Sequence, residues 1–195
     1  MNVRKIRLFT EVLLLYIISP LMFSLYISTI PLLFIIVLAG AIASAFLYFD
    51  LSFNFLGEFK TSRIQISKLR IFWAFFWVVI GTVMMLYINP KQLLFLSQNS
   101  NFLFIVIFPI LYTIFSVIPQ TLFYRTLFFY RYKELFSNKT LTIIVSAFLF
   151  SYSHIILLTI EAGVLTFFAG LIFSYFYSKD KSSLGSIIEH GTYGS

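Results

Sequence analysis

The 195-residue sequence is 60% hydrophobic and only 11% charged, has a formal net charge of +7 and contains no cysteine. Soluble domains carry roughly 25% charged residues, so this composition excludes an ordinary soluble protein, and the lack of cysteine excludes disulfides and thiolate chemistry. The apolar residues form long unbroken runs rather than short alternating segments, which predicts an all-α, polytopic transmembrane helix bundle.

The first half of the chain contains a short basic leader, Met1–Arg7, and three predicted spans. The spans lie at about Leu8–Ser28, Leu32–Phe49 and Ile71–Ile88. The second span has a face of small residues suited to close helix packing: Gly40, Ala41, Ala43, Ser44 and Ala45. The polar stretch Asp50–Arg70 is expected to be an extramembrane loop with a short interfacial helix.

Three more spans are predicted in the second half, at about Phe102–Ile118, Leu141–Leu158 and Ala162–Ser178. Pro109 should kink the fourth span, and Pro119 is expected to open a separate helix that continues to Phe136. A last apolar segment begins at Leu184. Because about twelve helical residues cover roughly 18 Å of a core of about 30 Å, it cannot span, and we interpret it as a truncated seventh span rather than a half-helix.

Basic residues alternate between the predicted connections. They follow the second, fourth and sixth spans and also form the leader, whereas the opposite side receives only Lys91 and Glu161. This pattern places the N-terminus in the cytoplasm by the positive-inside rule. We therefore expect an integral membrane protein of a bacterial plasma membrane, with membrane lipid as a partner and no nucleic acid.

Arg125 is the most unusual charged residue, because apolar and aromatic side chains flank it on both sides in LFYRTLF. A charge in such surroundings costs about 2.5–3.5 kcal/mol on insertion scales. On a helix Thr121 and Arg125 share a face, with Gln120 at its edge. Arg125 is thus either a functional residue or an interfacial arginine that extends to lipid headgroups.

The two histidines of the chain lie on two later predicted helices. His154 is inside a span, one turn after Phe150, and His190 is near the start of the last apolar segment. An ionisable residue within a span is a functional candidate, although a histidine packed against a backbone carbonyl is the plain alternative. Glu189 precedes His190 but points about 100° away on a helix, so the two do not form an obvious pair.

In their order, Arg125, the Phe150-x-x-x-His154 motif and His190 resemble the CAAX protease and bacteriocin-processing (CPBP, abortive-infection) family of intramembrane endopeptidases. That family has Glu-Glu-x-x-x-Arg, then Phe-x-x-x-His, then His-x-x-x-Asn or Asp. The segments FYRTLFFYRY and IEHGTYG also resemble one branch of it. The resemblance covers roughly residues 115–195.

What the resemblance implies is a glutamate that activates water for amide hydrolysis, histidines that bind this water or steady the oxyanion, and an arginine that orients a second carboxylate. This chain departs from the pattern, because Gln120 and Thr121 replace the glutamates and Gly194 stands four residues after His190. Glutamine cannot accept a proton at neutral pH, whereas neutral histidine can.

The resemblance makes Gln120, Arg125, His154 and His190 the candidate catalytic residues and Thr121 and Phe150 the candidate substrate-binding residues. We expect Gln120, His154 and His190 to converge around one cavity. No cofactor is expected, and His154 and His190 would be the ligands of any divalent metal.

Three functions are compatible with these observations. The first is a CPBP-type peptidase, a hydrolase acting on CAAX-like, prenylated-protein or leader-peptide substrates, weak or inactive without its carboxylate pair. The second is a non-catalytic membrane binding protein, such as a bacteriocin immunity or maturation partner. A transporter or channel subunit is disfavoured because the spans show no repeated pattern. One membrane domain is expected, with N-terminal spans at 1–110 and the motif-bearing core at 111–195.

Overall fold

The computed structural model describes residues 2–26, 29–88, 102–136, 138–157 and 159–194. These residues form helices, turns and loops without a strand, so the all-α prediction is confirmed for this part of the chain. The helical segments in chain order are α1 (Val3–Val12), η1 (Leu13–Ile18), α2 (Ser19–Ser24), α3 (Leu32–Tyr48), η2 (Leu56–Phe59), η3 (Thr61–Arg63), α4 (Lys68–Ile88), α6 (Phe102–Tyr112), η4 (Thr113–Val117), α7 (Ile118–Thr121), η5 (Leu122–Leu127), α8 (Phe128–Arg131), η6 (Lys133–Leu135), α9 (Lys139–Leu157), α10 (Ile160–Asp180) and α11 (Ser183–Gly194).

Within the described residues, three helices are long and apolar enough to cross a membrane: Val3–Ser24, Val106–Arg131 and Ile160–Asp180. Two shorter apolar helices, Leu32–Tyr48 and Lys139–Ile155, accompany them. These lengths support an integral membrane protein. The predicted connection at Asn89–Asn101 lies outside the described residues.

The first helix starts earlier than the hydropathy suggests. It begins at Val3 rather than Leu8, because the side chain of Asn2 accepts a hydrogen bond from the backbone N–H of Arg4 and caps the helix. The basic leader is therefore the first turn of the same helix, and its charges extend beyond the apolar part.

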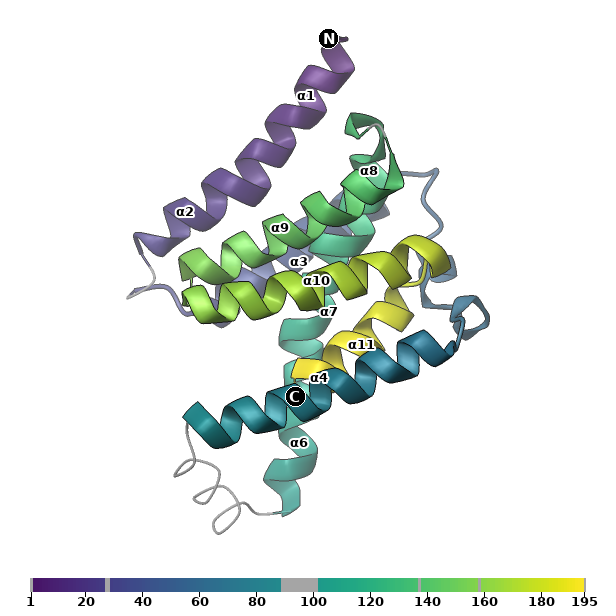
Figure 1. The fold of residues 1–195 in the computed structure, drawn as a ribbon. Coiled ribbons are helices and arrows are strands. Elements are labelled where there is room, and N and C mark those ends of the chain that lie inside the picture. The colour runs from purple at the N-terminus through teal and green to yellow at the C-terminus, as the bar shows by residue number, and fades with distance from the viewer. Residues whose placement is uncertain (1, 27–28, 89–101, 137, 158, 195) are drawn as a thin grey trace.

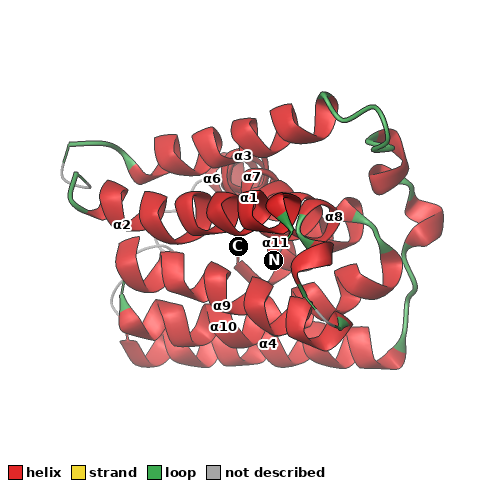
Figure 2. Cartoon of the chain, turned by 90° about the horizontal axis from the view of Figure 1, so that it is seen from above, coloured by secondary structure: helices red, strands yellow, loops and turns green. Residues whose placement is uncertain are grey.

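The prediction that Pro119 opens a new helix is wrong. The chain is helical without a break from Phe102 to Arg131, with both Pro109 and Pro119 inside it. A proline lacks a backbone N–H and crowds the carbonyl four residues earlier. For Pro119 that residue is Phe115, which lies in the wider π-helical turn η4, where the crowding can be relieved. This long helix runs steeply across α3, α9 and α10, and its α6–α7 part is seen nearly end-on from above (Figures 1 and 2).

Small residues permit the close helix contacts. A Cβ added at Gly40 would lie 2.5 Å from the Cβ of Pro119, so α3 can approach α7 only with glycine at this position. Gly40 and Ala43 are buried, whereas Ala41 and Ala45 are exposed, which narrows the predicted small-residue face. Helices α9 and α10 lie side by side along most of their length (Figures 1 and 2).

The segments predicted to be cytoplasmic meet at one end of the bundle (Figure 1). Arg4 of the leader forms an ion pair with Glu134 at 2.9 Å, and Arg63 of the 50–70 loop donates to the backbone oxygen of Lys181 at 3.0 Å. The same loop contacts Tyr130 through Ser52. The positive-inside pattern likewise groups the leader and three connections on one side.

Candidate functional site

Arg125 lies on the π-helical segment η5 with only 2% of its surface exposed. Its Nη1 donates to the backbone oxygen of Tyr124 at 3.2 Å and to Oγ of Ser146 at 3.1 Å. The guanidinium also lies 4.8 Å from the ring centroid of Phe150, a cation–π contact. Arg125 therefore points into the bundle, and the alternative of an arginine extended to headgroups does not describe this side chain.

No carboxylate lies within 4.0 Å of the Arg125 guanidinium among the residues that the structure describes. Its Nε is buried without a hydrogen-bond partner. Ser146 supports the arginine from α9, and Ser174 of α10 donates to Ser146 in turn at 3.2 Å. A buried cation held by hydroxyl, carbonyl and aromatic groups alone is incompletely compensated.

Gln120 occupies the position of the first glutamate in the family motif. Its Nε2 donates to Oγ of Ser116 at 2.8 Å, and its Oε1 is buried without a partner. Gln120 lines a narrow gap, too small for a water molecule as the side chains stand, together with Thr121, Arg125, Phe150, Phe173, Ser186 and His190. The hydroxyl of Ser186 is also unpaired.

The gap thus gathers three residues with unpaired polar atoms, namely Gln120, Arg125 and Ser186. A buried polar group without a partner costs roughly 1–3 kcal/mol. Arg125 Nε and the Ser186 hydroxyl can donate, whereas Gln120 Oε1 can only accept. A water molecule can therefore pair with either kind of atom, and a carbonyl group only with the two donors. The arrangement is suited to holding an oxygen-bearing ligand, although it contains no carboxylate to activate one.

His154 and His190 lie against the same aromatic ring. The ring centroid of Phe150 lies 4.5 Å from that of His154 and 5.6 Å from that of His190. The imidazole of His190 also stacks on the ring of Phe173, with the two centroids 5.1 Å apart. Nδ1 of His154 lies 2.8 Å from the backbone oxygen of Phe150. Because a carbonyl can only accept, this contact assigns the proton to Nδ1 and leaves Nε2 as an acceptor.

The expectation of one cavity around Gln120, His154 and His190 is wrong. His190 lines the narrow gap, whereas His154 lines a second, larger pocket, and Gln120 lines both. The separation follows from Phe150, whose ring packs against both imidazoles. The two predicted substrate-binding residues, Thr121 and Phe150, both line the gap, and they are 2% and 1% exposed, respectively.

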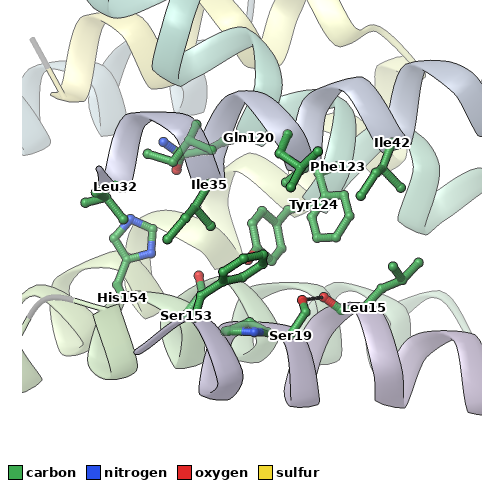
Figure 3. A pocket seen from close by; sticks show the side chains of 15 residues that line it. Leu15, Ser19, Leu32, Ile35, Ile42, Gln120, Phe123, Tyr124, Ser153 and His154 are labelled. Carbon is green, nitrogen blue, oxygen red and sulfur yellow. Dashed lines mark hydrogen bonds between the residues drawn. The ribbon is translucent and has the colours of Figure 1, made fainter. Parts of the chain in front are cut away.

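The larger pocket has a volume of about 240 Å³ and lies between the first helix, α3, the η5 segment and α9. Figure 3 shows apolar side chains such as Leu32, Ile35 and Ile42 along it, with His154 and Gln120 at one end. A mostly apolar pocket with a few polar side chains is the usual form of a small-ligand site.

A second buried arginine was not recognised from the sequence. Nε of Arg70 donates to Glu189 at 2.6 Å, its Nη2 to Asp180 at 2.7 Å and its Nη1 to the backbone oxygen of Gln65 at 2.6 Å. The guanidinium also lies 4.4 Å from the ring centroid of Phe176. Glu189 is therefore held by Arg70 and lines neither pocket, so it does not replace the missing carboxylates.

Glu58 fastens the 50–70 loop to the corner between α10 and α11. Its Oε2 accepts hydrogen bonds from Tyr177 at 3.0 Å and Ser183 at 3.1 Å, and Ser183 also contacts Thr126 at 2.6 Å. Burial raises the pKa of the Glu58 carboxyl, although these hydrogen bonds and Arg63 oppose the rise. The corner in turn positions α11 and its His190.

The polar residues in these clusters come from distant parts of the chain, and no spacing in the sequence connects them. The one signal available was that Glu189 lies in an otherwise apolar segment. Among the described residues, no group of three or more histidine, aspartate or glutamate side chains could hold a metal ion.

Comparisons with known proteins support the resemblance found in the sequence. A family model described as type II CAAX prenyl endopeptidase Rce1-like matches residues 99–195. No curated protein and no solved structure shows a significant match to the chain.

Proposed function

Because residues 99–195 are a Rce1-like type II CAAX prenyl endopeptidase (CPBP) family domain, we propose that this protein binds a peptide or prenylated-protein segment at Gln120, His154 and His190. We further propose that it hydrolyses such segments weakly or not at all. The observation that carries the proposal is the position of Gln120, which lines both pockets where a catalytic carboxylate would otherwise stand.

Binding is supported by the shape and chemistry of the two pockets. The apolar pocket of about 240 Å³ would accept a hydrocarbon group or apolar side chains, and its polar end lies at Gln120 and His154. The Nε2 atom of His154 and the Oε1 atom of Gln120 are acceptors that could orient a water or a substrate N–H.

Low activity is supported by the lack of a carboxylate side chain that could act as the general base. Neither pocket is lined by an aspartate or glutamate among the described residues. A positioned general base typically contributes about 10²–10⁴-fold to the rate of the catalysed reaction. His154 could accept a proton at Nε2, but its Nδ1–H is held by a carbonyl, which stabilises the imidazolium less than a carboxylate does.

The membrane arrangement belongs to the same proposal. We propose six full spans in a bacterial plasma membrane, with the N-terminus in the cytoplasm and the short α11 beside the spans. This topology would place the Arg125 region toward the cytoplasmic side. Residues 111–195 would form the core that carries the motifs, and residues 1–110 would supply the spans that complete the apolar pocket.

The test restores the missing carboxylates. The full chain is reconstituted in vesicles, and cleavage of a farnesylated CAAX peptide is measured for the wild type and for the double variant Gln120→Glu, Thr121→Glu. The wild type should cross-link a photoreactive peptide and cleave it slowly or not at all, and the variant should cleave at least about tenfold faster. The matched control is Thr61→Glu, Ser62→Glu, which adds two carboxylates on the exposed loop.

Two results would contradict the proposal. Rapid wild-type cleavage that disappears in His154→Ala would show an active peptidase despite Gln120. Failure of the wild type to cross-link the peptide, together with no gain in the restored variant, would favour the second function, a binding protein for another partner such as a bacteriocin.

A further inference from the structure

An open groove of about 570 Å³ lies between α4, α9 and α10, on the opposite side of α10 from the candidate site. Its rim carries Lys139, Thr140 and Lys179, and its walls include Trp73, Ile144 and Ile172. The start of α9, the end of α10 and the start of α4 meet here, at the end of the bundle where the basic connections gather (Figure 1).

The rim has uncompensated positive charge. Lys139 is the first residue of α9, where the helix dipole is already positive, and the first turn of α9 has no acidic residue. Neither Lys139 nor Lys179 has a carboxylate within 4.0 Å among the described residues, since the neighbouring Asp180 pairs with Arg70.

Other cations add to the same potential. Lys181 lies at the turn between α10 and α11, and burial together with the charges of Lys139 and Lys133 lowers its pKa. The ammonium of Lys179 lies 4.6 Å from the ring centroid of Tyr175, which holds it at the rim. These lysines repel one another, so an anion placed among them would stabilise the folded protein.

Below the rim the groove is apolar. Ile144 is 44% exposed and Ile172 is 9% exposed, so the walls offer a strip along α9 and α10 to a hydrocarbon chain. Trp73 stands near the start of α4, the depth at which tryptophan is favoured at a membrane–water interface. Cations above an apolar strip, between helices at a cytoplasmic face, match a phospholipid rather than a soluble anion.

We propose that this groove binds an anionic phospholipid, with its phosphodiester between Lys139 and Lys179 and an acyl chain against Ile144 and Ile172. The site is independent of the candidate peptide site, which lies on the other side of α10. We propose a lipid as the ligand because a lipid uses the charged rim and the apolar walls together.

The test measures lipid retention by native mass spectrometry on the full chain in detergent, with added phosphatidylglycerol or phosphatidylcholine of identical acyl chains. The wild type should retain phosphatidylglycerol preferentially. In Lys139→Gln, Lys179→Gln this retention should fall on the order of tenfold or more, while phosphatidylcholine retention stays unchanged. The matched control is Lys5→Gln, Lys60→Gln, which removes two exposed lysines outside the groove.

A second pair of variants tests the walls with the lysines intact. Ile144→Trp narrows the groove at its apolar wall and should also lower phosphatidylglycerol retention, whereas Ile114→Trp, on a similarly exposed part of η4, should not. Circular dichroism confirms that each variant is folded.

Several results would overturn the proposal. The first is equal retention of the two lipids by the wild type, a measurement that needs no variant. Equal effects of the two lysine pairs, or of the two tryptophan variants, would do the same. Displacement of phosphatidylglycerol by an equal concentration of inorganic phosphate would show a simple anion site instead.

Discussion

The two buried arginines of this protein are held in opposite ways. Arg70 forms ion pairs with Asp180 and Glu189 at 2.7 and 2.6 Å, whereas Arg125 has hydrogen bonds only to a carbonyl and a hydroxyl. Both also lie over a phenylalanine ring, Phe176 and Phe150 respectively. We infer that a buried arginine with carboxylate partners holds helices together, whereas a buried arginine without them indicates a potential binding site.

The unpaired polar atoms beside the two arginines also differ. Around Arg125 they belong to Gln120, Ser186 and Arg125 itself, and all three residues line one gap. Around Arg70 one such atom is Oε2 of Glu189, which lines neither the gap nor the apolar pocket. The first region therefore has polar groups that a ligand can satisfy, and the second joins α4 to the α10–α11 corner.

Removal of Arg70 should have the largest effect. Arg70→Met leaves Asp180 and Glu189 buried without a cation, which costs about 3–5 kcal/mol when one partner of a buried pair is lost. The measurement is the free energy of unfolding in mixed detergent micelles. Arg63→Met is the control, because Arg63 is more exposed and lies 3.7 Å from Glu58. Equal losses in the two variants would show that the Arg70 cluster is not a joint.

Removal of Arg125 should change the free energy of unfolding less than removal of Arg70 does. Arg125→Met gives up two hydrogen bonds and two cation–π contacts, to Phe150 and Phe173, but it also removes a buried charge that has no carboxylate partner. These terms oppose each other, so the free energy of unfolding should change by less than about 2 kcal/mol. In the same assay, a loss as large as that of Arg70→Met would mean that Arg125 is paired more strongly than its contacts indicate.

The smallest expected effect is a pH dependence at Glu58. Burial raises the pKa of this carboxyl above its ordinary value of 4.5 in the folded protein. Folding therefore favours the protonated form, and the stability that this adds is complete below 4.5 and is lost as the pH rises through the folded-state pKa.

The matching variant is Glu58→Gln, whose amide oxygen can still accept from Tyr177 and Ser183. Its midpoint temperature relative to the wild type should increase as the pH is raised from about 4 to about 8. Arg63 and Lys181 face the carboxyl and limit the size of this increase. A relative midpoint that decreases over the same range would show that these cations lower the pKa instead.

Much of this protein could be predicted from local sequence. The composition and the apolar runs indicate the all-α membrane class, and the bounds of four expected spans agree closely with those of the helices α3, α4, α9 and α10. The order of Arg125, Phe150-x-x-x-His154 and His190 indicates the family that the comparison then matched to residues 99–195. The joined helix through Pro119 could not be predicted, because a proline inside a helix depends on the π-helical turn beside it.

The sequence by itself determined which segments are apolar and where the chemically unusual residues stand, because both follow from the identity of residues close together in the chain. Only the tertiary structure decided which polar groups meet. Arg70 pairs with Asp180, 110 positions later, and Phe150 separates two histidines that sequence order alone would place around one cavity. Such contacts depend on how helices pack, and helix packing brings together residues whose spacing carries no signal in the sequence.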